Sequence, residues 1–163
     1  MSELPAYPEA AAKREEAEGP PAPSGQYASW GRRALALTLD NVLLLIPAVV
    51  FFVLIFAPND VVTVISAFLA VFFWLVFPFI YFTALHGRVG GGQTIGKRAL
   101  GIGVRHAETG ETIGYGASFG RYAMVFLFAL FTLPMILDYL FPLWDGKNQT
   151  LHDKVATSVV MRL

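Results

Sequence analysis

The sequence predicts an all-α integral membrane protein with two full transmembrane helices in a hairpin, a third apolar segment interrupted by proline, and a small cytoplasmic β-hairpin. Hydrophobic residues make up 55% of the 163 residues and charged residues only 15%, whereas about a quarter of a soluble domain is charged. Three long stretches are almost free of charge, and each exceeds the roughly 20 residues that cross a bilayer as a helix. The 14 Phe, six Tyr and three Trp residues suit acyl chains and the headgroup boundary.

The first 29 residues differ from the rest, because they are rich in Pro, Ala and Glu and poor in bulky aliphatic side chains. Such a segment cannot bury enough apolar surface to offset the entropy of ordering it. We therefore expect residues 1–29 to be a disordered cytoplasmic tail and residues 30–163 to form the membrane domain.

Two apolar stretches predict the transmembrane hairpin. Residues 34–56 contain one charge, Asp40, and residues 61–85 contain none. The four residues 57–60 form a tight turn, so the two helices are expected to be antiparallel neighbours. A soluble protein would need a large partner to bury both helices on all sides.

A polar segment, residues 86–117, follows the hairpin and is rich in glycine at its start. Residues 99–105 are typical of a short strand, residues 108–110 of a turn and residues 111–113 of a returning strand. This pattern predicts a small β-hairpin outside the membrane.

Within that segment, Gly91, Gly96 and Lys97 have the spacing of a phosphate-binding loop, but Arg98 stands where Ser or Thr would ligate magnesium. No buried strand precedes the glycines, which argues against nucleotide binding. The alternative is a flexible basic loop that meets anionic lipid headgroups.

The third apolar stretch, residues 120–143, allows two arrangements. A single straight span is favoured by its length, but it would place three basic residues of the C-terminal segment 144–163 outside. Because Pro134 removes a helical hydrogen bond, two short helices over residues 120–132 and 135–144 could instead enter the membrane and return. We favour the returning arrangement, which lets a strand at 157–161 pair with residues 99–105. Residues 150–155 predict a short amphipathic helix.

The distribution of basic residues predicts the orientation. Nine of the 12 Lys and Arg residues lie before the first span or in or beside the central polar segment, and none lies in the turn 57–60. Basic loops remain cytoplasmic, so we expect a multi-pass protein of the bacterial cytoplasmic membrane with its N-terminus inside. Trp30 fits an interfacial anchor at the start of the first span.

Asp40 is the strongest candidate for chemistry. It lies two helical turns after Arg33, on the same helix face. An ionised carboxylate in hydrocarbon is costly, so Asp40 should face the protein interior or a water-filled path. There it could pair with Arg33, with Arg121 or with an arginine of a neighbouring subunit. One interpretation is a proton or cation site, and the other is a structural ion pair that locks two helices.

The other charged residues have weaker signals. Asp138 has the same two interpretations as Asp40, and Arg121 at the membrane edge can extend its guanidinium group to the headgroups. Asp145 and Asp153 lie in the polar C-terminal segment, where we expect helix capping and solvation. The His residues lack the spacing of metal ligands and no catalytic constellation is present, so we expect no metal, no cofactor and no enzymatic activity.

Three separated motifs resemble the RDD family of bacterial membrane proteins, named for one arginine and two aspartates. Arg33 and Asp40 match the arginine that opens the family's first helix and the aspartate inside it. The second aspartate corresponds to Asp145 or to Asp153, and both alternatives stay open. The remaining signature residues are Thr94, Gly96, Lys97 and Arg98 of the central motif, and His152 of the Gln-x-Leu-His-Asp-Lys motif. Ile95 departs from the proline that the family often has.

The resemblance implies a largely unassigned function, although some members resemble cation–proton antiporters. We expect a homo-oligomer that moves cations or protons, with Asp40 as the ion-handling carboxylate and Arg33 as its modulator, since three spans are few for a transport path. The alternative is an accessory subunit of a larger membrane complex. The formal net charge of zero gives no signal for nucleic acid.

Overall fold

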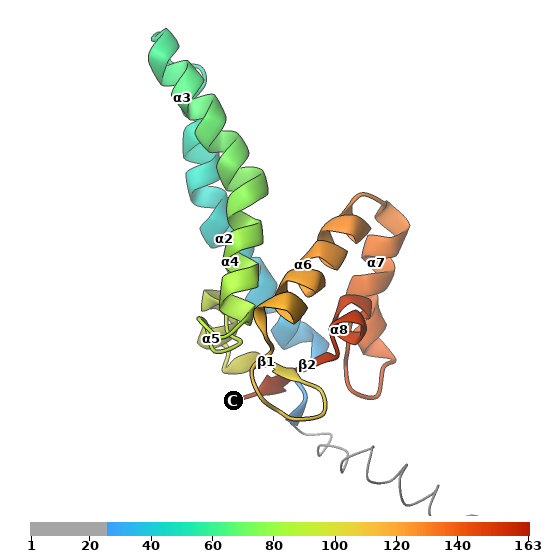
Figure 1. The fold of residues 1–163 in the computed structure, drawn as a ribbon. Helices are drawn as coiled ribbons and strands as arrows, with labels where there is room; N and C mark the ends of the chain where they lie inside the picture. The colour runs from blue at the N-terminus through green and yellow to red at the C-terminus, as the bar shows by residue number, and fades with distance from the viewer. Residues whose placement is uncertain (1–25) are drawn as a thin grey trace, which may run out of the picture.

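A tall pair of antiparallel helices stands on a compact base in the computed structural model, which describes residues 26–163 (Figure 1). Helix α2 (Trp30–Leu54) rises from the base. The chain returns through α3 (Asp60–Val71), a π-helical turn (Phe72–Val76) and α4 (Phe77–His86).

Both arms of this hairpin are long enough and apolar enough to cross a membrane. Helix α2 has 25 residues and the continuous run Asp60–His86 has 27. Only 17% and 11% of their most apolar windows are buried, whereas the core helix of a soluble protein would be mostly buried. The two predicted long apolar helices are therefore confirmed. Their turn ends at Asn59, whose side chain caps α3 by accepting a hydrogen bond from Val62 N.

The third apolar segment forms two helices rather than one. Helix α6 (Tyr115–Ala129) rises from the base and α7 (Thr132–Leu140) descends beside it (Figure 1). The predicted return of the chain in two short helices is confirmed, and a single straight helix over residues 120–143 is wrong. The chain turns at residues 130–131, earlier than predicted, because Pro134 lies in the first turn of α7. There its missing N–H breaks no helical hydrogen bond.

A two-stranded antiparallel sheet closes the base. Strand β1 (Ile102–His106) pairs with β2 (Ser158–Arg162), with Val104 opposite Val160. The predicted β-hairpin is wrong, because residues 111–113 form no strand, although the Glu111 carbonyl accepts a hydrogen bond from His106 N. The predicted pairing with a C-terminal strand at 157–161 is confirmed, and that strand supplies five paired residues. It also buries Val160 against the core that β1 forms.

Two short helices complete the base. Helix α5 (Ile95–Ala99), which we did not predict, takes up the start of the expected strand 99–105. Helix α8 (Leu151–Val155) lies within the helix predicted over residues 150–155, and Thr150 and Asp153 form its capping box.

The tail boundary at residue 29 is too late, because Tyr27 forms a bridge with Met161 and Ala28 is fully buried. A hydrogen bond explains why these residues belong to the folded base: Ala28 N donates to Val160 O at 2.8 Å, which extends the edge of β2. The rest of the predicted tail, residues 1–25, lies outside the described residues.

Candidate functional site

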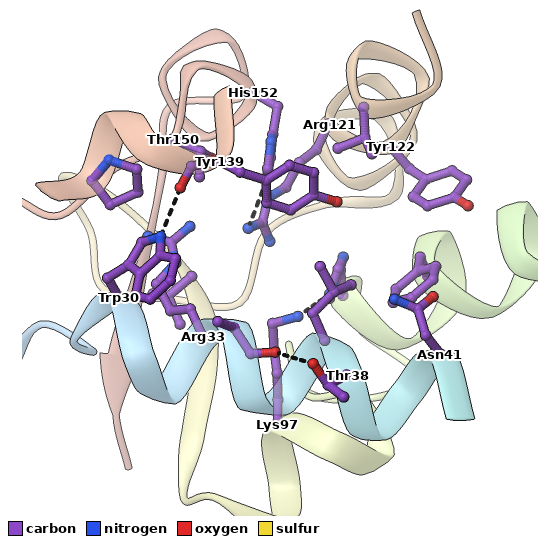
Figure 2. Close-up of a pocket in the computed structure, with 17 residues that line it drawn as sticks. Trp30, Arg33, Thr38, Asn41, Lys97, Arg121, Tyr122, Tyr139, Thr150 and His152 are labelled. Atoms are coloured by element: carbon purple, nitrogen blue, oxygen red, sulfur yellow. Dashed lines mark hydrogen bonds between the residues drawn. The ribbon is translucent and has the colours of Figure 1, made fainter. Parts of the chain in front are cut away.

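A cavity of about 290 Å³ opens in the base, and side chains of α2, α4, α5, α6, α7 and α8 line it (Figure 2). All of the charged side chains in its wall are basic: Arg33, Lys97 and Arg121, accompanied by His86 and His152. Apolar and aromatic side chains form much of the remaining wall, among them Trp30, Leu37, Phe82, Tyr122 and Tyr139. The cavity therefore combines a cationic part with an apolar part.

Trp30 links two sides of this cavity. Its indole Nε1–H donates to the carbonyl of Tyr139 at 2.8 Å, which joins the start of α2 to α7 (Figure 2). A buried or half-buried indole usually needs such an acceptor, so Trp30 positions α7 against α2.

Asp153 is the centre of the charge network behind the cavity wall. Its carboxylate is fully buried and pairs with Arg33 and, at 2.5 Å, with Arg121. Burial alone would raise the pKa of Asp153, but the guanidinium groups of Arg121 and Arg33 hold it well below its ordinary value. The expectation that Asp153 is solvated is therefore wrong, although its capping role on α8 is confirmed.

Asp138 and His152 form the second pair of this network. The Asp138 carboxylate accepts hydrogen bonds from His152 N at 2.9 Å and from the ring Nδ1 at 2.6 Å. Burial lowers the pKa of His152, although the contact with Asp138 opposes the shift. A neutral ring that donates from Nδ1 leaves Nε2 as the acceptor for Arg121, at 3.4 Å. Asp138 thus fixes the tautomer that faces Arg121.

Asp40 has no arginine partner, and the expectation that it pairs with Arg33 or Arg121 is wrong. Among residues 26–163 no basic side chain lies within salt-bridge distance of its carboxylate. Neutral donors compensate the fully buried charge instead. These donors are Thr94 Oγ1 at 2.6 Å, Gly96 N at 2.7 Å and Tyr81 OH at 2.8 Å.

Gly96 makes this arrangement sterically feasible. A Cβ atom at this position would lie 2.2 Å from the carbonyl oxygen of Ala36 and 3.0 Å from the Asp40 carboxyl carbon. Only glycine lets α5 approach α2 closely enough for its backbone N–H to reach Asp40. The signature residues Thr94 and Gly96 therefore share one structural role, which is to donate hydrogen bonds to the Asp40 carboxylate.

Lys97 points into the cavity rather than into a flexible surface loop. Its side chain is buried, and Nζ lies 2.9 Å from His86 Nε2 (Figure 2). Burial, together with the nearby Arg121, lowers the pKa of Lys97 to about 7, although Asp40 opposes the shift. The expectation that Lys97 belongs to a flexible basic loop at the surface is wrong, whereas the neighbouring Arg98 is exposed.

Asp145 lies apart from the cavity. It accepts from Gln149 N at 2.9 Å and pairs with the partly exposed Lys154 at 2.6 Å. Of the two aspartates left open for the second signature position, Asp153 contacts Arg33 and Asp145 does not.

The sequence did not single out His86 or Tyr81. His86 ends an apolar helix, next to a glycine-rich turn, and this position could have marked it as a cavity residue. Tyr81 carries no comparable signal, because a tyrosine in an aromatic helix is ordinary. Within the described part of the chain, no group of three His, Cys, Asp or Glu side chains is arranged to hold a metal ion.

Fold and site together define a mostly helical protein with two exposed apolar helices that could span a membrane, standing on a base with a buried ionic network. The RDD family model matches residues 27–157. The match covers most of the chain, so the chain belongs to the RDD family.

Three curated relatives match part of the chain. The "Proline-rich antigen homolog" of Mycobacterium tuberculosis strains CDC 1551 / Oshkosh and ATCC 25618 / H37Rv is 43% identical over 68 residues, which are 42% of this chain and 27% of the relative. The "Proline-rich antigen" of Mycobacterium leprae strain TN is 40% identical over 70 residues, which are 43% of this chain and 27% of the relative. The matched part thus spans about a quarter of these relatives' length. No solved structure shows significant similarity to the chain.

Proposed function

We propose that this chain is a multi-pass protein of the bacterial cytoplasmic membrane that moves protons, with Lys97 and His86 as the proton-handling pair. The observation that carries the proposal is the buried contact of 2.9 Å between Lys97 Nζ and His86 Nε2 in the cavity wall. Because burial lowers the pKa of Lys97 to about 7, its ammonium group can release a proton near neutral pH. His86 Nε2 is the hydrogen-bond acceptor next to this ammonium group.

The exposed surface of the hairpin supports membrane insertion. Large apolar side chains such as Phe68, Val53 and Trp74 are more than half exposed along both arms, and water would penalise that much exposed apolar surface. We place the N-terminus and the base on the cytoplasmic side, because all 12 Lys and Arg residues lie there.

Protons fit the cavity better than metal cations do. The cavity wall contains Arg33, Lys97 and Arg121 but no carboxylate side chain. A sodium or potassium ion would therefore meet repulsion and would find no carboxylate ligand in the wall. A proton needs only two adjacent basic groups that can exchange it.

Asp40 has a positioning role in this proposal rather than the ion-handling role expected from the sequence. Three donors occupy its oxygens, and it does not line the cavity. Its contacts with Thr94 and Gly96 fix α5, which carries Lys97. Arg33 acts on Asp153 rather than on Asp40.

Two long apolar helices are few for a complete path across a membrane, so we propose that the path forms between copies of this chain. The alternative function is an accessory subunit of a larger membrane complex. The two functions predict different results on purification. A proton-moving protein should purify as a homo-oligomer that conducts by itself, whereas an accessory subunit should co-purify with other proteins and should not conduct.

The experiment is a proton-flux assay on the purified full chain in liposomes that contain a pH-sensitive dye. A potassium gradient with valinomycin supplies the driving potential. We expect flux above that of empty liposomes, and we expect its dependence on pH to have a midpoint near 7, where Lys97 titrates.

Lys97→Met should abolish the flux, whereas the matched control Arg98→Met should retain it, because Arg98 is exposed on the same helix. Both variants remove one positive charge from α5. Flux equal to that of empty liposomes would overturn the proposal, as would equal flux in both variants. Co-purification with a large complex, together with absent flux, would favour the accessory function.

A further inference from the structure

We propose that the cavity is a binding site for a phosphate-type oxyanion, held by Arg121, Lys97 and Arg33. The site shares Lys97 with the proposed proton movement but does not rest on that movement, because it depends on donors of Arg121 and Lys97 that the network leaves unused. The ligand could be the phosphate of an anionic lipid headgroup or a free phosphate, and the experiment below separates these sources.

Arg121 provides the first argument. Its side chain is 3% exposed, and its Nη2 atom contacts Asp153 and His152. Its Nε and Nη1 atoms are buried and have no hydrogen-bond partner. A buried guanidinium N–H without an acceptor carries a desolvation cost, so an acceptor in the adjacent cavity would stabilise it.

The arrangement of Arg121 in the cavity supports this role. Figure 2 shows its guanidinium group reaching from α6 into the middle of the cavity, opposite Lys97. A second buried nitrogen, Nδ1 of His86, is also without a partner. Lys97 Nζ has three hydrogens, and its contact with His86 is one hydrogen bond, so donors remain for a ligand.

The charges around the cavity favour an anion. The charged residues in the wall are basic, and the three nearby carboxylates already have partners behind it. Asp153 is occupied by two arginines, Asp138 by His152 and Asp40 by neutral donors. No acidic side chain of the wall would repel an incoming anion.

The direction of the donors favours a tetrahedral group over a planar carboxylate. Arg33 belongs to α2, Lys97 to α5 and Arg121 to α6, so cationic groups approach the cavity from three elements. A phosphate presents oxygens in several directions and matches this arrangement. The apolar part of the wall, which includes Leu37, Tyr122 and Val125, suits the glycerol and first methylene groups of a lipid.

The test measures binding to the purified full chain in a neutral detergent. One arm titrates phosphatidylglycerol and, as a comparison, zwitterionic phosphatidylcholine, with native mass spectrometry as the readout. The other arm titrates inorganic phosphate and follows the midpoint of thermal unfolding. Neither arm requires flux, so failure here is distinguishable from failure of the proposed proton movement.

Arg121→Lys is the main variant, because it retains a cation beside Asp153 but removes Nε and Nη1. Lys97→Gln is the second variant, in case Arg121→Lys does not fold, and Arg98→Gln is the exposed control. We expect both site variants to bind at least about 10-fold more weakly than the native chain. Arg98→Gln should bind like the native chain.

The two arms identify the source of the phosphate. Tight phosphatidylglycerol binding that excess inorganic phosphate cannot displace indicates a lipid headgroup, and saturable stabilisation by inorganic phosphate alone indicates a free anion. The proposal is overturned if neither ligand distinguishes the native chain from the site variants. It is also overturned if Arg98→Gln weakens binding as much as they do, because general surface charge would then explain it.

Discussion

Asp40 lies on the long helix α2 among neutral hydrogen-bond donors, whereas Asp153, on the short helix α8, lies between two arginines. Both carboxylates are fully buried. The Asp40 region joins α2 to α4 and α5 through Tyr81, Thr94 and Gly96. The Asp153 region joins α8 to α2 and α6 through Arg33 and Arg121.

This difference shows that the protein stabilises a buried aspartate in two physically different ways. Neutral donors stabilise a carboxylate by short charge-assisted hydrogen bonds, and the group keeps its net negative charge. Guanidinium groups balance the charge directly, but each ion must then be desolvated, so the network depends on every member. We therefore expect removal of the charge to be more damaging at Asp153 than at Asp40.

Asp153→Asn should have the largest effect on stability. It leaves Arg33 and Arg121 buried without a negative partner, and loss of one partner of a buried pair costs about 3–5 kcal/mol. Thermal or denaturant unfolding of the purified protein in detergent measures the change. A loss below about 1 kcal/mol would contradict the ionic role assigned to Asp153.

The dependence of stability on pH provides an independent check of the ionic role of Asp153. The folded-state pKa of Asp153 lies well below 3.8, its value in the unfolded chain. Its contribution to stability is therefore fully present above that value and is lost as the pH falls below it. The native chain should lose stability on acidification more steeply than Asp153→Asn does.

Asp40→Asn should have an intermediate effect, a loss of about 1–3 kcal/mol. The amide NH₂ replaces an acceptor oxygen, so at least one of the three donors loses its partner. The same unfolding measurement applies, with Thr94→Val as the matched variant that removes one donor and retains the carboxylate. A loss for Asp40→Asn as large as that for Asp153→Asn would break the distinction between the two regions.

Lys154→Ala should have the smallest effect. It breaks the pair with Asp145, but the Lys154 side chain is 42% exposed, so solvent and salt screen the interaction. Pairs of this kind contribute about 0–1 kcal/mol. The unfolding midpoint should move little, and the difference from the native chain should shrink further at high salt.

The sequence predicted the two long helices because uncharged length is a local property that needs no knowledge of the fold. It also predicted α8 and, through the positions of three basic residues, the return of the third segment. The predicted hairpin of residues 99–105 and 111–113 was wrong, since neighbouring segments are the nearest partners available to sequence reasoning. The pairing of residues 99–105 with a C-terminal strand at 157–161, which the sequence also predicted, is the one that forms, because the return of the third segment brings β2 beside β1.

The sequence by itself determined which stretches are apolar and that Asp40 among them needs compensation. Only the tertiary structure decided how each carboxylate is compensated. Arg33 and Asp153 are 120 positions apart, and Asp40 and Gly96 are 56 positions apart. Electrostatic and hydrogen-bond energies depend on separations of a few ångströms in space, and such separations arise only when the helices pack.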